Sequence, residues 1–297
     1  MFSLDGYRAL RTDGGVIRRT DRAVLAVTGA DRSTWLQGLV TNDVASLAPG
    51  EARYAAYLTP QGRMITDMTV FARADRLLLG VPAPLAASLR VRLDGLIFAD
   101  DAHVLDSSDT LEVWSAIGPN DGAITDVIVE AGQPHGVSYP EINFDTFEVV
   151  RIERGIPRFL VDMDDQIIPL EAGIEERAIS FTKGCYVGQE VIVRVTHRGG
   201  GRVAKRLVRW KAAELASGDK PTGGDKPTGG DKPLGLSVAP EARILSGDRD
   251  IGRVTSAAFS PDHNAIVGLG YVHRDFVNRG TEVTVVWNDA RTNAQVR

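Results

Sequence analysis

The chain has 297 residues, enough to bury a large core and divide into two or three domains, and its 43% hydrophobic and 25% charged residues are ordinary for a soluble globular protein. Its net charge of −5 argues against general attraction to nucleic acid or anionic membranes, and no apolar stretch approaches the length of a membrane span. The single cysteine excludes an intrachain disulfide and, with an N-terminus that lacks a secretory signal, predicts a cytoplasmic protein.

The first half of the chain alternates between strand and helix patterns. Trp35, Leu36 and Leu39 recur at helical spacing, and Thr59-Pro60-Gln61-Gly62 is typical of a hairpin turn. In chain order we expect a strand over 24–27, a helix over 31–43, a hairpin of strands 53–58 and 63–71, a strand over 77–81, a helix over 85–96, and strands over 102–105 and 111–117. This alternation indicates an α+β fold rather than a doubly wound parallel sheet.

The second half begins with a helix and continues as strands and turns. Residues 145–154 form a helical pattern closed by Gly155 and Pro157. The strands that follow are expected at 203–210, 242–246, 251–259, 264–272 and 281–287, and they predict a separate all-β domain. A six-residue repeat starts at Asp219 and recurs at 225–230; its glycine and proline content favours a flexible loop over 218–234 rather than a binding motif.

The only cysteine lies in the octet Lys183-Gly184-Cys185-Tyr186-Val187-Gly188-Gln189-Glu190. A lysine two residues before the thiol favours the reactive thiolate, and closely spaced glycines indicate a tight turn or close backbone approach. The alternative is that Cys185 is a small buried hydrophobe. The β-branched residues that follow, 191–195, favour a strand by propensity alone.

Two carboxylates are candidates for ligand binding. Side chains alternate across a strand, so Asp67 is expected to share a face with Ile65 and Thr69. It either faces a cleft, where it would bind an amine or ring nitrogen, or occupies a partly wet edge position. Glu171 follows Pro169-Leu170, and its two oxygens match the paired donors of an aminopyrimidinone ring, although an acid in such a place is more often simply solvated.

The octet resembles the signature of the YgfZ-type folate-binding proteins, relatives of the glycine-cleavage T-protein (aminomethyltransferase). The resemblance covers nearly the whole chain and includes the segments 35–44, 151–157, 168–173 and 252–272. It implies folate domains in a cloverleaf arrangement over 1–202, with a ferredoxin-like middle piece at about 50–140, and a β-barrel over 203–297. It also implies a helix that begins near Gly188, which would place Cys185 just before a helix N-terminus and further favour the thiolate.

The resemblance also implies the site residues. One of a pair of acids in the T-protein hairpin is placed against the reacting folate nitrogen; here the first of the pair is Thr66 and only Asp67 remains. Glu171 is expected to grip the pterin, and Tyr54 and Arg151 are predicted to join Asp67 and Glu171 as folate contacts. Cys185 and Asp67 are the predicted catalytic groups. The T-protein typically has aspartate and phenylalanine where Cys185 and Tyr186 stand, so this chain resembles the YgfZ and mitochondrial iron–sulfur assembly branch.

The resulting hypothesis is a tetrahydrofolate-binding protein that supports assembly or repair of iron–sulfur clusters, including those of tRNA-modifying enzymes. The alternatives are a folate-dependent aminomethyltransferase or demethylase and a non-catalytic scaffold. Seven cations without an intervening acid, from Arg194 to Lys211, indicate either a solvated face or a docking surface for a folate tail, an acidic partner or, with weakest support, tRNA. The five histidines have no metal-ligand spacing, so no metal is predicted.

Overall fold

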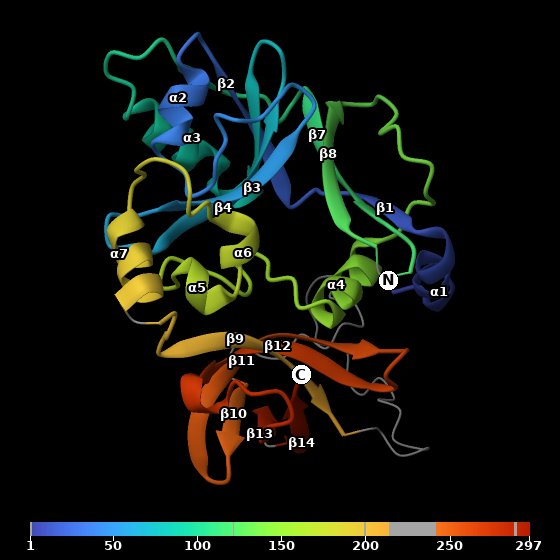
Figure 1. Ribbon diagram of the computed structural model, residues 1–297. Helices are drawn as coiled ribbons and strands as arrows, with labels where there is room; N and C mark the ends of the chain where they lie inside the picture. The colour runs from blue at the N-terminus through green and yellow to red at the C-terminus, as the bar shows by residue number, and fades with distance from the viewer. Residues whose placement is uncertain (1, 121, 199, 214–241, 288–289) are drawn as a thin grey trace. The chain divides into compact units, whose positions relative to one another are not determined.

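The computed structural model describes residues 2–120, 122–198, 200–213, 242–287 and 290–297 (Figure 1). They fall into two units, described separately below. The sheet unit comprises Ala9–Glu141 and Met163–Arg202, and the barrel unit comprises Met1–Arg8, Ile142–Asp162 and Val203–Arg297. Helix α1 (Leu4–Asp13) runs from one into the other. The repeat loop expected over 218–234 lies outside the described residues.

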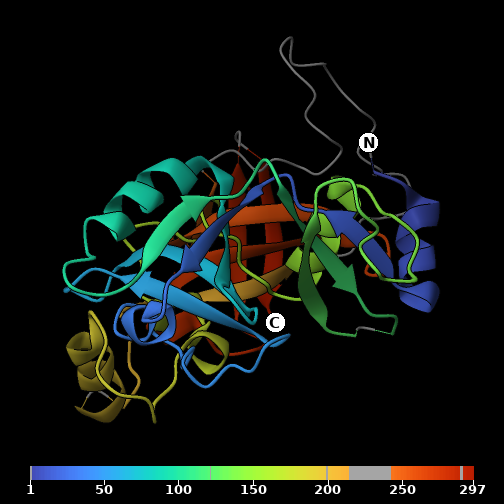
Figure 2. The same ribbon diagram turned by 90° about the horizontal axis from the view of Figure 1, so that it is seen from above.

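The sheet unit is built on a five-stranded antiparallel sheet whose strands lie in the order β3-β4-β5-β2-β6. The strands are β2 (Arg22–Thr28), β3 (Ala52–Leu58), β4 (Met64–Ala72), β5 (Leu77–Pro82) and β6 (His103–Asp106). Helices α2 (Arg32–Gln37) and α3 (Ala86–Asp94) cover one face, where Leu36, Leu89 and Leu93 join the sheet's largest buried apolar cluster (Figure 2). Removing these apolar side chains from water stabilises the sheet and fixes which face each β4 residue occupies.

A second sheet lies against the other face. Its strands, in the order β1-β7-β8, are β1 (Gly15–Arg18), β7 (Leu111–Ile117) and β8 (Ile124–Glu130). Val24, Phe71 and Leu78 of the first sheet pack against Val113 and Ile128 of the second. The two sheets therefore enclose a second, smaller apolar layer.

Three short helices complete the sheet unit: α5 (Pro169–Ala172), α6 (Glu175–Ala178) and α7 (Gln189–Val193). The helix expected after Gly188 is confirmed, although its last three residues are β-branched, and it continues into a π-helical turn over Arg194–Arg198. Packing thus outweighs the strand propensity of this segment. No helix in the part of the chain that the structure describes is long and apolar enough to cross a membrane.

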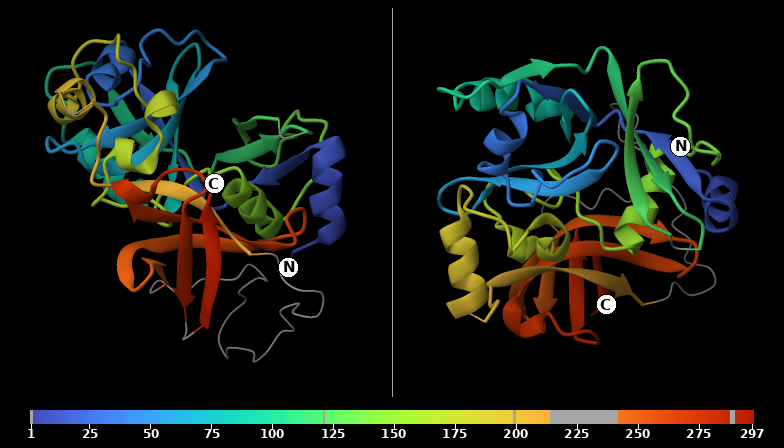
Figure 3. Two further views of the ribbon diagram at one scale, coloured as in Figure 1. Left: turned by 60° about the horizontal axis from the view of Figure 1, so that its bottom comes forward. Right: turned by 45° about the horizontal axis from the view of Figure 1, so that its top comes forward.

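The barrel unit contains a closed barrel of strands in the order β10-β11-β12-β9-β14-β13. They are β9 (Lys205–Ala212), β10 (Arg243–Ser246), β11 (Arg249–Ser260), β12 (Ala265–His273), β13 (Glu282–Trp287) and β14 (Ala290–Val296). Helix α4 (Phe144–Glu153) packs on β11 and β12 (Figure 3). The predicted mixture of helix and sheet and the predicted C-terminal barrel are confirmed; α1, β1, β8 and β14 were not expected from the sequence.

Two local predictions are wrong. Helix α2 ends at Gln37 rather than near residue 43, because the Gln37 side chain accepts hydrogen bonds from the backbone N–H groups of Val44 and Ala45 and holds the chain in a turn. On β4, a bulge shifts the pairing with β3, so Ile65 packs with Met68 against the helix-covered face instead of sharing a face with Asp67.

Candidate functional site

A buried carboxylate, Asp67 on β4, is the centre of the candidate site. Its side chain is 1% exposed, and the guanidinium of Arg22 binds both oxygens, at 2.8 Å to Oδ1 and 3.1 Å to Oδ2. The hydroxyl of Tyr54 donates a third hydrogen bond, 2.8 Å long, to Oδ2. A charge buried this deeply needs such partners, because removing it from water is otherwise costly. The alternative of a partly wet edge position is therefore wrong.

The order of the strands explains how Arg22 reaches Asp67. Arg22 on β2 is paired with Pro82 on β5, and the register that pairs Thr69 with Gly80 brings Asp67 level with the same proline. The two charged side chains therefore lie in one row across β5. Burial lowers the pKa of Arg22, but the surrounding negative and polar groups, Asp67 foremost among them, together raise that pKa to above its ordinary value, so the guanidinium stays charged.

The phenol of Tyr54 extends this buried ion pair by one further hydrogen bond. Burial and the negative charge of Asp67 raise the pKa of Tyr54, so its hydroxyl is protonated at neutral pH and donates to Asp67. The guanidinium carbon of Arg177, on α6, lies 4.3 Å from the centroid of the Tyr54 ring, within the range of a cation–π contact. Tyr54 is half-buried and Arg177 is exposed, so these two residues are more accessible than the buried Asp67 to which Tyr54 donates.

Glu171 lies on α5, in the same unit as Asp67. Its Oε2 accepts a hydrogen bond from the backbone N–H of Ile168, 3.3 Å away, and this contact caps the short helix. Within the described part of the chain no bond to Oε1 is made, and the side chain is half-buried. Met64, at the start of β4, donates to the carbonyl of Ile167 and so ties the segment before α5 to the hairpin that carries Asp67.

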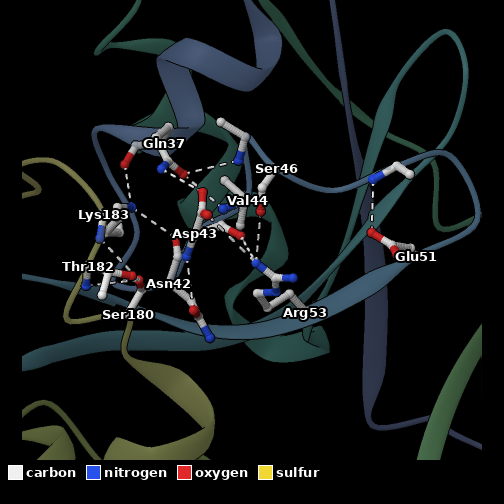
Figure 4. A network of polar contacts seen from close by, with 12 residues as sticks. Gln37, Asn42, Asp43, Val44, Ser46, Glu51, Arg53, Ser180, Thr182 and Lys183 are labelled. Atoms are coloured by element: carbon white, nitrogen blue, oxygen red, sulfur yellow. Dashed lines mark hydrogen bonds and ion pairs between the residues drawn. The ribbon is translucent and has the colours of Figure 1, made fainter.

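The thiol of Cys185 is exposed, so the alternative of a small buried hydrophobe is wrong. Lys183, two residues before it, lies in a network of polar contacts (Figure 4). The Lys183 ammonium donates to the carbonyls of Gln37, Val40 and Asn42, at 2.6, 2.7 and 2.8 Å, which uses all three of its donors. Burial lowers the pKa of Lys183 to about 8, against the opposing effect of Asp43, so the group is still mostly protonated at neutral pH. The structure thus gives Lys183 an anchoring contact at the end of α2.

Gly188 holds the other end of this loop against the hairpin turn. Its φ of 84° is left-handed, and a Cβ placed there would lie 2.5 Å from the carbonyl oxygen of Thr59 and 3.3 Å from the Cα of Gly62. Only glycine permits this approach. Gly184, in contrast, has open space around it. The two glycines of the octet therefore have different physical roles.

Arg151, predicted as a folate contact, belongs to the barrel unit, whereas Asp67, Tyr54 and Glu171 belong to the sheet unit. Its five N–H groups donate to Glu148, twice, and to the Ile156 carbonyl, Asp162 and Ser256. The side chain is buried, and Asp162 is buried with it. These contacts give Arg151 a structural role within the barrel unit, which the sequence did not suggest.

The seven cationic residues from Arg194 to Lys211 are divided between the sheet unit and the barrel unit. Arg194 belongs to the turn after α7, whereas Arg209 on β9 donates to the carbonyl of Glu153 at the end of α4. The Lys205 ammonium lies 5.3 Å from the Tyr271 ring. Some of these cations therefore make packing contacts, and the anion-docking surface stays a prediction.

Sequence reasoning missed Arg22 and Arg177. Arg22 opens a strand with no motif around it, and only strand order brings it to Asp67. Arg177 follows Glu175 and Glu176 and looks like an ordinary solvated charge. A buried aspartate in a central strand does imply a cationic partner, but it does not say which one.

Two family models match the sequence: the GCVT N-terminal domain over residues 3–124 and the glycine cleavage T-protein C-terminal barrel domain over residues 232–297. In the solved structures, the fold is similar to that of glycine cleavage system aminomethyltransferase T from Bartonella henselae, with a TM-score of 0.76, 16% identity, and coverage of 99% of this chain and 88% of that chain. At this identity the similarity shows the fold alone, and it confirms the predicted T-protein fold.

Among protein relatives, an uncharacterized protein of Haemophilus influenzae is 30% identical over 213 residues, 67% of this chain and 75% of the relative. An iron-sulfur cluster assembly factor IBA57 homolog, mitochondrial, of Phaeosphaeria nodorum is 24% identical, with 82% of this chain and 68% of the relative covered. The tRNA-modifying protein YgfZ of Yersinia enterocolitica is 25% identical, with 66% and 70% covered. The chain thus belongs to the glycine-cleavage T-protein superfamily, as a YgfZ-type member related to the IBA57 proteins.

Proposed function

We propose that this protein binds tetrahydrofolate and supports the assembly or repair of iron–sulfur clusters, including those of tRNA-modifying enzymes. The proposed role in iron–sulfur cluster assembly rests on the similarity to relatives named for iron–sulfur cluster assembly and for tRNA modification. The T-protein fold supports the folate part of the proposal. The cytoplasmic location remains a prediction.

Glu171 is the residue proposed to bind the pterin ring. Its Oε1, which no described residue bonds, and its half-buried position suit a pair of ring N–H donors, because a charged acceptor makes shorter and stronger hydrogen bonds than a neutral one. Tyr54 and Arg177 supply the other proposed contacts. Arg151 is not among them, since all five of its donors are used within the barrel unit.

Replacing Glu171 by glutamine is expected to weaken tetrahydrofolate binding by about tenfold or more, because the amide loses both the charge and one acceptor. Isothermal titration calorimetry on the full chain measures this change. Glu176→Gln, on the exposed surface of α6, is the matched control and is expected to bind as the wild type does. Undiminished binding by Glu171→Gln would remove Glu171 from the site.

Cys185 is proposed to act as a thiolate toward a partner protein or its cluster, and its exposed position supports contact with a macromolecule. In cells that lack this protein, Cys185→Ser is expected to leave the activity of iron–sulfur tRNA-modifying enzymes as low as in the deletion. Thr182→Ala, an exposed change in the same loop, is expected to restore it. Full rescue by Cys185→Ser would instead favour the scaffold alternative.

The second candidate is the folate-dependent aminomethyltransferase, which the T-protein fold favours. The ion pair between Asp67 and Arg22 opposes it, because the acid that would face the folate nitrogen is already occupied.

A further inference from the structure

The hydrogen bonds that Asp67 already accepts limit what it can do in the proposed folate site. Both carboxylate oxygens accept from Arg22, Oδ2 also accepts from Tyr54, and the side chain is 1% exposed. A carboxylate that took a proton from a substrate would give up part of the bidentate contact and leave the Arg22 guanidinium, 11% exposed, beside a neutral acid. Asp67 is therefore poorly suited to accept a proton from an amine or a folate nitrogen.

The same contacts determine what Tyr54 offers to a ligand. Its one O–H donor points at Asp67, so the oxygen has only acceptor lone pairs left. Tyr54 is half-buried, and the guanidinium of the exposed Arg177 lies over its ring. A ligand at this phenol must donate a hydrogen bond, as the N–H groups of a reduced pterin do.

We infer that Asp67 is a positioning residue, fixed by Arg22, which turns the Tyr54 hydroxyl inward so that the phenol oxygen accepts a hydrogen bond from bound tetrahydrofolate. The inference rests on the proposed folate binding. It makes Arg22 the residue that separates folate binding from one-carbon transfer in this chain, because Arg22 keeps the acid away from the ligand.

A double-mutant cycle on tetrahydrofolate affinity tests this inference. Tyr54→Phe leaves the ion pair in place and removes the acceptor, so it is expected to raise Kd about tenfold. Asp67→Asn is expected to raise Kd by a similar factor, because it acts through Tyr54. The double variant is expected to be no worse than either single variant, since residues that act through one contact are not additive.

If Asp67→Asn does not fold, the Arg22→Gln/Asp67→Asn pair, which removes both charges together, replaces it in the cycle, and circular dichroism monitors folding. Losses that multiply to about a hundredfold would make Asp67 a direct ligand contact and overturn this inference alone. Formation of methylenetetrahydrofolate from a supplied aminomethyl donor by the wild type, lost in Asp67→Asn even at saturating tetrahydrofolate, would also overturn it. Absence of tetrahydrofolate binding by the wild type would overturn the inference together with the proposed folate function.

Discussion

Replacing Arg151 by methionine is expected to lower the free energy of unfolding by about 4 kcal/mol, because it leaves a buried carboxylate without its cation. Asp162 is fully buried, 2.8 Å from the guanidinium, and the same guanidinium binds Glu148 and Ser256. These contacts join α4 and the segment after it to β11. Urea denaturation of the full chain measures the loss.

Arg243→Met is the matched control. Arg243 is also on the barrel unit, but its side chain is 64% exposed and the carboxylate it pairs with, Asp250, is 3.8 Å away and exposed as well. An exposed pair of this kind contributes little, so the expected change is within about 0.5 kcal/mol. If Arg151→Met kept wild-type stability but weakened tetrahydrofolate binding, Arg151 would be a ligand contact, as the family resemblance implies.

An alanine at position 188 is expected to cost about 3 kcal/mol, because a left-handed backbone and a steric clash both oppose it. The added Cβ would lie 2.5 Å from the carbonyl oxygen of Thr59, which belongs to the hairpin turn and cannot move freely. The chain before α7 must then shift away from the turn and carry the Cys185 loop with it. Thermal and urea unfolding measure the loss of stability.

Gly184→Ala provides a control within the same octet. No heavy atom lies within 4 Å of the added Cβ, so stability is expected to stay within about 0.5 kcal/mol of the wild type. Equal losses at the two positions would mean that the octet is sensitive to any side chain. The contact between Gly188 and the hairpin turn would then not explain its glycines.

Much of the fold follows from local patterns. The hairpin around Gly62, the helix α4 and most barrel strands could be predicted because apolar periodicity and turn residues act over a few positions. The helix α7 could not be predicted from propensity, since Val191 and Ile192 favour a strand; only the resemblance of the octet to a family indicated it. The bulge at Ile65 had no visible signal, because it arises from how β4 pairs with β3.

The candidate site, like the fold, has parts that the sequence predicts and parts that it does not. Asp67, Glu171 and Cys185 were predicted as site residues from the sequence. A carboxylate in an apolar strand and a lone thiol between glycines drew attention to Asp67 and Cys185, and the family resemblance implied the roles of all three. Their partners could not be predicted. Arg22 comes from a strand two positions away in the sheet, and the carbonyls that bind Lys183 lie more than a hundred residues earlier in the chain.

The sequence by itself determined the family, the α+β class and the residue types available for chemistry, since these depend on short motifs and on composition. Only the tertiary structure decided which charges meet. It paired Asp67 with Arg22, used every donor of Arg151 inside the barrel unit, and left Cys185 exposed. The physical reason is that the energy of a buried charge depends on neighbours brought close by strand order and packing, and these neighbours lie far away along the chain.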